Sequence, residues 1–290
     1  FLTLKWRKCL YFLQTIIRRI VMANFDISQF KVVESPYYQE QFNEVDLYKV
    51  AYSSRLPLMI KGPTGCGKSR FIEHMAYKLD KPLITVSCNE DITASDLIGR
   101  FLLDSDGTRW VDGPLTIAAR HGAICYLDEI VEARQDTMVV IHSLTDHRRE
   151  LMIDKKGELL KAHPDFQLVI SYNPGYQSIM KDLKQSTKQR FVALDFDFAS
   201  PEIEVIIVSN ESGVDPEIAK KLVQFANATR KLVGHGLDEG ASTRLLNYAG
   251  VLISKGVDIK DACQIALIKP ITDDTEVREA MNTSMEAIFG

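Results

Sequence analysis

The segment GPTGCGKS, at residues 62 to 69, constrains the fold of this chain more than any other stretch. It matches the pattern G-x-x-x-x-G-K-[ST] in full, with fixed residues at Gly62, Gly67, Lys68 and Ser69. The apolar run LPLMI precedes it and the helical pattern SRFIEHMAYKL follows it. Strand, glycine-rich turn and helix is the order that a phosphate-binding loop requires, because backbone N–H groups and the helix start must face the phosphates. The segment therefore predicts a nucleotide site in an α/β protein.

The residues of this loop have separate expected roles. Lys68 is expected to reach the β- and γ-phosphates, and the Ser69 hydroxyl to ligate Mg²⁺, so ATP and Mg²⁺ are the expected cofactors. Further nucleotide contacts are expected at Gly62, Pro63, Thr64, Gly65, Cys66, Gly67 and Arg70. Cys66 occupies a position that accepts many residues. We expect an exposed thiol there, whose oxidation or alkylation would affect the nucleotide site.

Short apolar runs alternate with helical patterns between residues 30 and 198. Five of these runs are expected to be strands, at 56–60, 82–88, 122–128, 166–173 and 191–198. Alternation of this kind predicts a mostly parallel sheet with helices on both faces. Two stretches with turn signals interrupt the alternation and predict inserted β-hairpins, at 101–113 and 148–162.

From Pro201 onward the apolar residues have helical spacing, and several segments begin with Asp, Ser or Thr and end in Gly. We therefore expect an α/β domain over 22–200 and a helical lid domain over 201–290. Residues 1–21 are basic and apolar in patches, but they lack a cleavage site and a membrane-length apolar run. We expect them to be an extension upstream of a natural start at Met22, with a membrane-surface amphipathic helix as the alternative.

Charge and cysteine usage exclude several classes of protein. The formal net charge is −4 and no long basic block is present, which argues against a protein whose main task is coating nucleic acid. The five cysteines are scattered without a C-x-x-C pair, which is typical of a reducing, cytoplasmic compartment. Because no H-E-x-x-H pattern is present either, magnesium carried by the nucleotide is the only metal expected.

Polar residues follow two of the expected strands. Asp128 and Glu129 end the run AICYL, where the Asp is expected to hold Mg²⁺ and the Glu to polarise the attacking water. The alternative is that two acidic residues merely end a strand. Asn173 follows the next run, where its amide is expected to position that water, although N-P-G can also be a simple turn. The acidic pair indicates NTP hydrolysis.

Two arginines are candidates for stabilising the negative charge that develops on the γ-phosphate in the transition state. Arg190 lies just before the last expected strand, and Arg244 opens a helix of the second domain. Either could be a solvated surface charge. As catalytic residues, Arg190 would reach in from a neighbouring subunit, and Arg244 would close the helical lid over the nucleotide.

Together, GPTGCGKS, CYLDE, SYNPG, KQRF and GASTR resemble the AAA+ ATPases of the MoxR branch, in which such segments are Walker A, Walker B, sensor 1, arginine finger and sensor 2. Within that branch, LPLMIKGPTGCGKSRF, DGPLTIAARHGAICYLDE and GHGLDEGASTRLL are similar to the CbbQ/NirQ/NorQ/GpvN family. The similarity covers about residues 30–290. It implies an AAA+ core with inserted hairpins, a helical lid and a homo-hexameric ring with ATP between subunits.

The resemblance also implies partners. A protein carrying a von Willebrand factor A domain, CbbO-like or NorD-like, would dock on the ring and select the client. The client is Rubisco blocked by inhibitory sugar phosphates in the CbbQ case, which we place first, with a cytoplasmic or carboxysome-associated location. It is nitric oxide reductase in the NorQ/NirQ case, and GpvN acts in gas-vesicle assembly. The hairpin residues 101–110 and 151–160 match positions that face the pore or top of the ring, where client contact and plain packing remain open.

Three other classes of function stay as alternatives. A DNA-acting AAA+ ATPase is disfavoured by the acidic balance and by the lack of an appended DNA-binding domain. A small-molecule phosphotransferase would use the same loop, but the Asp-Glu pair favours hydrolysis. The pair also argues against a non-hydrolysing scaffold. No binding of nucleic acid and no integral membrane span are expected.

Overall fold

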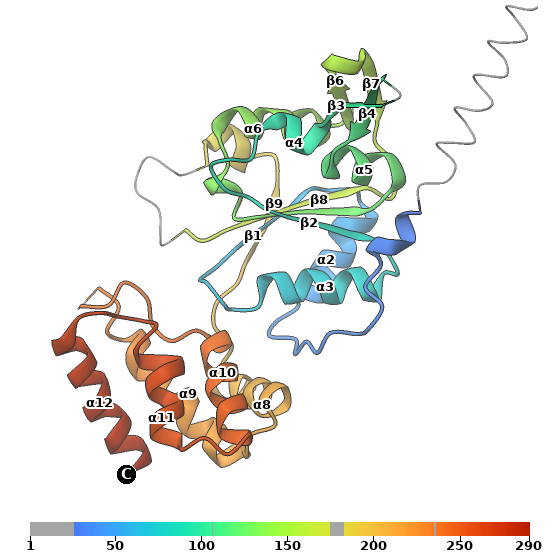
Figure 1. Ribbon diagram of the computed structural model, residues 1–290. Coiled ribbons are helices and arrows are strands. Elements are labelled where there is room, and N and C mark those ends of the chain that lie inside the picture. Colours follow the sequence, from blue (N-terminus) through green and yellow to red (C-terminus); the bar gives the residue numbers. More distant parts are fainter. Residues whose placement is uncertain (1–25, 106, 175–182, 235) are drawn as a thin grey trace, which may run out of the picture.

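The computed structural model describes residues 26–105, 107–174, 183–234 and 236–290 (Figure 1). The expected extension at 1–21 lies outside these residues, as does part of the stretch between Asn173 and Arg190. The chain forms an α/β region up to residue 200 and a helical region from residue 201 onward (Figure 1).

A five-stranded parallel sheet lies at the centre of the α/β region, in the order β2-β5-β8-β1-β9. All five expected strands are confirmed, as β1 (Leu58–Lys61), β2 (Leu83–Ser87), β5 (Ile124–Asp128), β8 (Gln167–Tyr172) and β9 (Val192–Asp195). Every residue of β8 is buried, because helices cover both faces of a parallel sheet. Since β8 lies between β5 and β1, the loops that follow these three strands meet at one edge.

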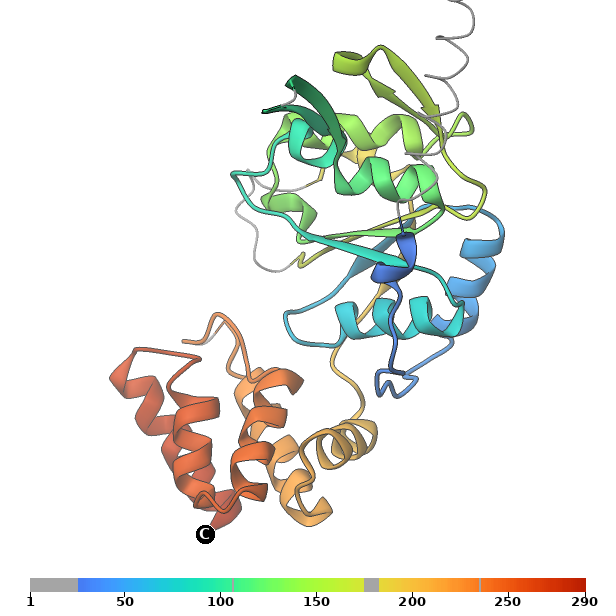
Figure 2. The ribbon, with the colours of Figure 1, turned by 45° about the vertical axis from the view of Figure 1, so that its right-hand side comes forward.

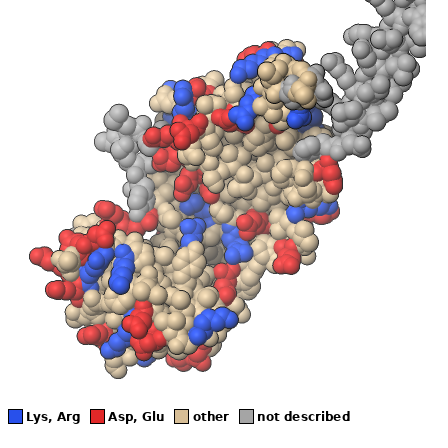
Figure 3. Space-filling model, viewed as in Figure 1, with Lys and Arg blue, Asp and Glu red and all other residues tan. Residues whose placement is uncertain are grey.

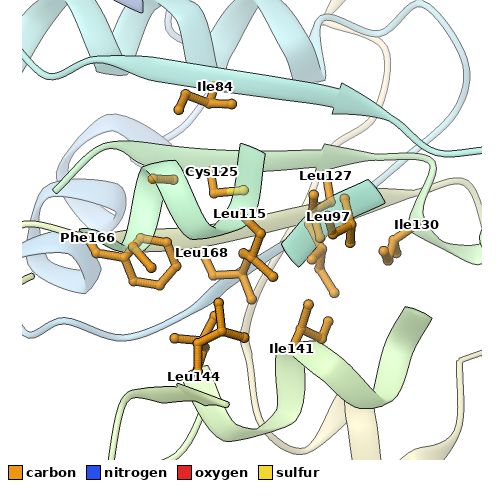
Figure 4. Packing of buried hydrophobic residues seen from close by; sticks show 14 of the residues in the cluster. Ile84, Leu97, Leu115, Cys125, Leu127, Ile130, Ile141, Leu144, Phe166 and Leu168 are labelled. Carbon is orange, nitrogen blue, oxygen red and sulfur yellow. The ribbon is translucent and has the colours of Figure 1, made fainter. Parts of the chain in front are cut away.

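Helices cover both faces of the sheet (Figures 1 and 2). One face carries α2 (Glu44–Ser53) and α3 (Lys68–Lys78), and the other carries α4 (Ala94–Ile98), α5 (Pro114–His121) and α6 (Gln135–Ile141). Tyr48 and Phe71 meet edge to face on the first side, with ring centroids 5.6 Å apart. Leu115, Leu127 and Phe166 interlock on the second side (Figure 4). Truncation of such buried side chains to Ala typically destabilises a protein by about 2–5 kcal/mol.

Both expected hairpins are confirmed, as β3–β4 (Gly99–Asp104 and Gly107–Asp112) and β6–β7 (Glu150–Ile153 and Glu158–Lys161). One guanidinium joins them, because Arg120 Nε donates to Asp112 at 2.9 Å and its Nη1 donates to Glu158 at 2.7 Å. The remaining short helical turns of this region are η1 (Ile27–Phe30), η2 (Ile130–Glu132), η3 (His142–Leu144), η4 (Asp154–Lys156) and α7 (Gln185–Lys188).

The helical region has a core of its own, in which Leu222, Phe225, Leu246 and Met281 have no exposed surface. Its helices are α8 (Pro201–Ser212), α9 (Pro216–Arg230), α10 (Thr243–Ser254), α11 (Ile259–Cys263), the π-helical turn η5 (Gln264–Ile268) and α12 (Thr275–Phe289). Side chains of Ser or Asp accept backbone N–H groups at the N-termini of five of them, which confirms the capping signals of the sequence. No helix among the described residues combines the length and apolar character needed to cross a membrane.

Candidate functional site

The phosphate loop connects the end of β1 to the start of α3. Gly65 and Gly67 have φ angles of 71° and 102°, a range in which a Cβ atom is strained. A Cβ at Gly62 would lie 2.4 Å from a backbone oxygen of the chain after β9. The Lys68 ammonium donates to the carbonyl oxygens of Gly62 and Pro63, at 2.8 and 2.9 Å. The loop therefore curls around its own lysine, with the ammonium held inside the turn.

Three hydroxyl groups surround the carboxylate of Asp128. Ser69 Oγ donates to its Oδ2 at 3.2 Å, and Tyr126 donates to its Oδ1 at 2.7 Å. Ser171 Oγ also donates to Oδ1. Burial, followed by the charge of Asp128, raises the pKa of Tyr126, so the phenol stays protonated and remains a donor.

The sequence pointed to Ser69 and Asp128 but not to the other two hydroxyls. The positions of these two hydroxyls, on Tyr126 and Ser171, follow from the strands that carry them. Tyr126 precedes Asp128 by two residues and so points to the same face of β5. Ser171 is brought alongside by the pairing of β5 with β8, in which Leu127 lies opposite Ile170.

These oxygens fit a magnesium ion. Mg²⁺ prefers hard oxygen ligands, and it usually binds through one or two protein oxygens together with substrate phosphates. Ser69 and Asp128 supply one hydroxyl and one carboxylate in contact with each other. Among the described residues, no three His, Cys, Asp or Glu side chains gather into a self-contained metal site.

A cavity of about 490 Å³ lies between the phosphate loop and the helical region, a size typical of small-molecule sites. Its lining includes loop residues 64–70, the Asp128–Glu129 pair, and Tyr37 and Tyr38 from the segment before α2. Helix α10 closes the other side with Thr243, Arg244, Asn247 and Tyr248. Lys and Arg side chains gather where the two regions meet (Figure 3). The size of the cavity and the phosphate loop in its wall, with Lys68 and Arg244, suit it to a nucleotide.

Glu129 is exposed to the cavity and has a left-handed backbone, with φ of 53°. Such a conformation costs a non-glycine residue roughly 1–2 kcal/mol, and the backbone N–H of Glu129 donates to Ser171 Oγ at 3.3 Å. Asn173 Nδ2 lies 3.4 Å from Thr64 Oγ1 and 3.3 Å from Glu239 Oε1. Asn173 thus touches both the phosphate loop and the helical region. The contact with Glu239 could not be foreseen from the sequence.

The two arginines lie in different places. Arg244 lines the cavity, and a Cβ added to Gly65 would lie 3.3 Å from the Cβ of Arg244. Arg190 precedes the N-terminal end of β9, whereas the phosphate loop follows the C-terminal end of its parallel neighbour β1. Its Nη1 donates to the carbonyl of His142 at 3.3 Å, and its Nε is buried with no hydrogen-bond partner among the described residues. One chain therefore brings Arg244, and not Arg190, to the loop.

The expectation of an exposed thiol in the loop is wrong. Cys66 is only 4% exposed and packs into the core beneath the loop, with Phe71 and Phe196 in the same cluster. Burial raises the pKa of this thiol, although the charge of Lys68 opposes the shift. Cys66 therefore belongs mainly to the core beneath the loop, and only its small exposed part borders the cavity.

Two family models match the chain. The model of an AAA domain (dynein-related subfamily) matches residues 57–191, and that of a CbbQ/NirQ/NorQ C-terminal domain matches residues 204–288. Protein CbbQ of Hydrogenophilus thermoluteolus is 65% identical, over 90% of this chain and 98% of its own length. Protein NorQ of Paracoccus denitrificans is 53% identical over 89% and 96%, and the denitrification regulatory protein NirQ of Pseudomonas aeruginosa is 52% identical over 83% and 92%.

Solved structures share the fold at low sequence identity. A mutant of RuvB from Thermotoga maritima superposes with a TM-score of 0.53 at 15% identity, covering 86% of this chain and 76% of that one. This likeness concerns the fold alone, and it agrees with the AAA+ architecture expected from the sequence.

Proposed function

This chain belongs to the CbbQ/NirQ/NorQ family of AAA proteins, and on that premise we propose that it hydrolyses ATP, with Mg²⁺, to remodel a client enzyme. The observation that carries the proposal is the contact of Ser69 with Asp128 in the same cavity as Glu129. A phosphate loop, a metal-binding carboxylate and a second, free-standing carboxylate are the parts that hydrolysis of a γ-phosphate needs.

The chain's own residues have the following roles in this reaction. Glu129, which lines the cavity, takes a proton from the attacking water. Asn173 orients that water from the side of Thr64. Lys68 and Arg244 balance negative charge on the phosphates. Mg²⁺, held through Ser69 and Asp128, would supply further charge neutralisation when bound.

Arg190 supports a ring of identical subunits. Because it lies at the opposite edge of the sheet from its own phosphate loop, its guanidinium acts only on a nucleotide bound by a neighbouring chain. We propose that this ring is a homo-hexamer, the number of subunits that the resemblance to MoxR-branch ATPases implies. Mixing Arg190→Ala subunits with Glu129→Gln subunits should then restore part of the lost ATPase activity, because some sites receive both intact residues. No recovery in mixed rings would count against action in trans.

For the client, the identity of 65% to the CbbQ relative, against 53% and 52% to the NorQ and NirQ relatives, favours Rubisco activation. The ring would act in the cytoplasm, with or without a carboxysome, through a CbbO-like adaptor that carries a von Willebrand factor A domain. It would release inhibitory sugar phosphates from Rubisco. The alternative is activation or assembly of nitric oxide reductase with a NorD-like adaptor, or gas-vesicle assembly of the GpvN type.

The two hairpins are candidates for the surface that contacts adaptor or client. Each exposes large apolar side chains, with Phe101 and Leu103 48% and 82% exposed, and Met152 and Leu159 51% and 57% exposed. Exposed apolar clusters of this kind mark interaction sites. The shared ion pairs of Arg120 would make the hairpins move as one unit.

The proposal is tested by reactivation of sugar-phosphate-inhibited Rubisco, using this chain, its cognate adaptor and ATP. We expect recovery of carboxylation that requires both proteins and is lost in Lys68→Ala. A parallel assay with nitric oxide reductase and a NorD-like adaptor covers the alternative. ATP hydrolysis without reactivation of a matched Rubisco would favour that second client, and stimulation of hydrolysis by DNA would favour a DNA-acting protein.

A further inference from the structure

Residues 239–244, here called the bridge segment, are the end of the connection from α9 to α10 together with the first two residues of α10, and they touch the nucleotide site at both ends. At one end, Glu239 accepts a hydrogen bond from Asn173 at 3.3 Å. At the other end, Ser242 lies so close to the phosphate loop that a Cβ on Gly65 would approach its Oγ to 2.7 Å. Arg244, the last residue of the segment, lines the cavity. The position of Arg244 over the phosphates therefore depends on what holds this segment.

The middle of the bridge segment rests on Arg230, the last residue of α9. Arg230 Nε donates to the carbonyl of Ala241 at 2.9 Å. Gly240 lies directly against it, because a Cβ at Gly240 would come within 2.6 Å of the Arg230 Cα. The backbone N–H of Ala241 donates to Thr229 Oγ1 at 2.9 Å. Only glycine allows this close approach, so the segment and the end of α9 form one packed unit.

Arg230 is in turn fixed by a carboxylate with no exposed surface. Its two terminal nitrogens donate to the two oxygens of Glu204 in α8, at 2.7 and 2.8 Å. Thr243, next to Arg244, donates to the same carboxylate at 2.6 Å. A two-pronged guanidinium–carboxylate pair fixes angle as well as distance. Because buried ion pairs add little stability compared with apolar packing, their use here points to geometry rather than to strength.

The same guanidinium contacts the link between the two regions. The Arg230 Cζ lies 3.8 Å from the ring centroid of Phe198, which follows β9 and precedes α8. Stacking of a guanidinium on an aromatic face is favourable when both are shielded from water. Arg230 thus contacts the link, α8 and the bridge segment at once. Through Arg230, the link is therefore in contact with the segment that carries Arg244.

We propose that Arg230, held by Glu204, is a positioning residue for ATP hydrolysis: it sets the bridge segment so that Arg244 meets the phosphates. This inference rests on the proposed ATPase function. Its test is a double-mutant cycle between Arg230→Lys and Arg244→Ala in the full chain, with kcat and KM for ATP as readouts. Lys keeps the charge but cannot bind Glu204, Ala241 and Phe198 together.

If Arg230 acts through Arg244, Arg230→Lys lowers kcat by about 10- to 100-fold, the range expected for a misplaced catalytic group, with a smaller change in KM. In the Arg244→Ala background, the same substitution then has less than about a twofold further effect. Full additivity of the two losses would overturn the inference. Absence of ATP hydrolysis by the wild-type chain would instead overturn the proposed function, so the two failures are distinguishable.

The matched control is Arg278→Lys, which alters an ion pair with Asp273 (2.7 Å) elsewhere in the helical region. It should leave kcat unchanged; an equal loss would mean that any weakened ion pair in this region lowers activity, and would contradict a specific role for Arg230. Where Arg230→Lys does not fold, Thr243→Val decides, because it removes only the hydroxyl contact to Glu204. A smaller loss of kcat, absent in the Arg244→Ala background, supports the inference, and an unchanged kcat rejects it.

Discussion

Each region of the molecule holds one carboxylate that organises its part of the site, and the two carboxylates have different kinds of hydrogen-bond partner. In the α/β region, Asp128 is surrounded by hydroxyl groups, and the ion pairs of the described residues leave it without a cationic partner. In the helical region, Glu204 is fully buried and is paired with both terminal nitrogens of Arg230. A carboxylate left with its charge is suited to a metal ion, whereas one already neutralised can only hold other groups in place.

The difference separates chemistry from positioning. The groups that we propose to act on the γ-phosphate, Glu129 and Asn173, directly follow buried strands, so the sheet fixes their backbone before any ligand arrives. The helical region is proposed to contribute Arg244, at the N-terminus of α10, which the Glu204–Arg230 ion pair would hold beside the phosphate loop. Substitutions in the first set should therefore affect turnover, and substitutions in the second should affect stability or placement.

The largest expected effect is that of Glu129→Gln, which removes the carboxylate but keeps its size. We expect ATP hydrolysis to fall by about 10²–10⁴-fold, the usual contribution of a general base, with ATP affinity retained. Phosphate release and equilibrium nucleotide binding measure the two quantities. Glu202→Gln, on an exposed position at the start of α8, is the control and should match wild type. Residual activity within about tenfold of wild type would remove Glu129 from this role.

The two carboxylates, Glu204 and Asp128, should also differ in how much each contributes to the free energy of unfolding. Glu204→Leu leaves Arg230 buried without its partner and should lower the free energy of unfolding by about 3–5 kcal/mol. The double variant Glu204→Leu/Arg230→Met should recover most of this loss. Asp128→Asn leaves no cation unpaired, so we expect a loss below about 1 kcal/mol together with loss of hydrolysis. Urea unfolding of the four proteins gives the comparison, and equal losses for Asp128→Asn and Glu204→Leu would contradict it.

A third carboxylate, Glu158, is expected to contribute less to stability than Glu204, because its ion pairs are partly exposed. The hydrogen bonds of Arg120 lower the pKa of Glu158 to about 2. In the unfolded chain the pKa of a Glu side chain is about 4.3, so the unfolded chain binds more protons than the folded one between about pH 2 and 4.3. The stabilisation by the ionised Glu158 is therefore complete above about pH 4.5 and is lost as the pH falls toward 2. Lowering the pH from 6 to 3 should reduce the free energy of unfolding of wild type by about 1–2 kcal/mol more than that of Glu158→Gln, after allowance for solvent screening.

The difference between the two unfolding free energies isolates Glu158 from the other acidic groups, because both proteins share them. An equal pH dependence in wild type and Glu158→Gln would mean that this pair adds nothing to the coupling of the hairpins. An effect larger than that of Glu204→Leu would reverse the ranking of exposed and buried pairs on which the comparison depends.

Much of the α/β region could be predicted because its signals are local. Apolar runs bounded by turns gave the strands, and the spacing from Gly62 to Ser69 needs only a strand before it and a helix after it. Asp128 and Asn173 were found because each stands at the end of such an apolar run. The sequence could not supply the order of the strands, and for that reason the place of Ser171 beside Asp128 was missed.

The missed parts depend on contacts between distant segments. Glu204 and Arg230 lie 26 positions apart on different helices, and nothing in either segment marks them as partners. The contact of Glu239 with Asn173 spans 66 positions. Cys66 was misjudged for a related reason, because a glycine-rich loop suggests exposure while its burial depends on residues packed beneath it.

The central claim is that the two regions share one nucleotide site, with Arg244 of the helical region at the γ-phosphate. Equilibrium binding of ATP and ADP to Glu129→Gln, with and without Arg244→Ala, tests it without interference from hydrolysis. A charge-assisted hydrogen bond contributes about 1.5–3 kcal/mol, so Arg244→Ala should weaken ATP binding by at least about tenfold. ADP, which lacks the γ-phosphate, should change by less than about threefold. Equal losses for ATP and ADP, or no loss for either, would contradict the claim.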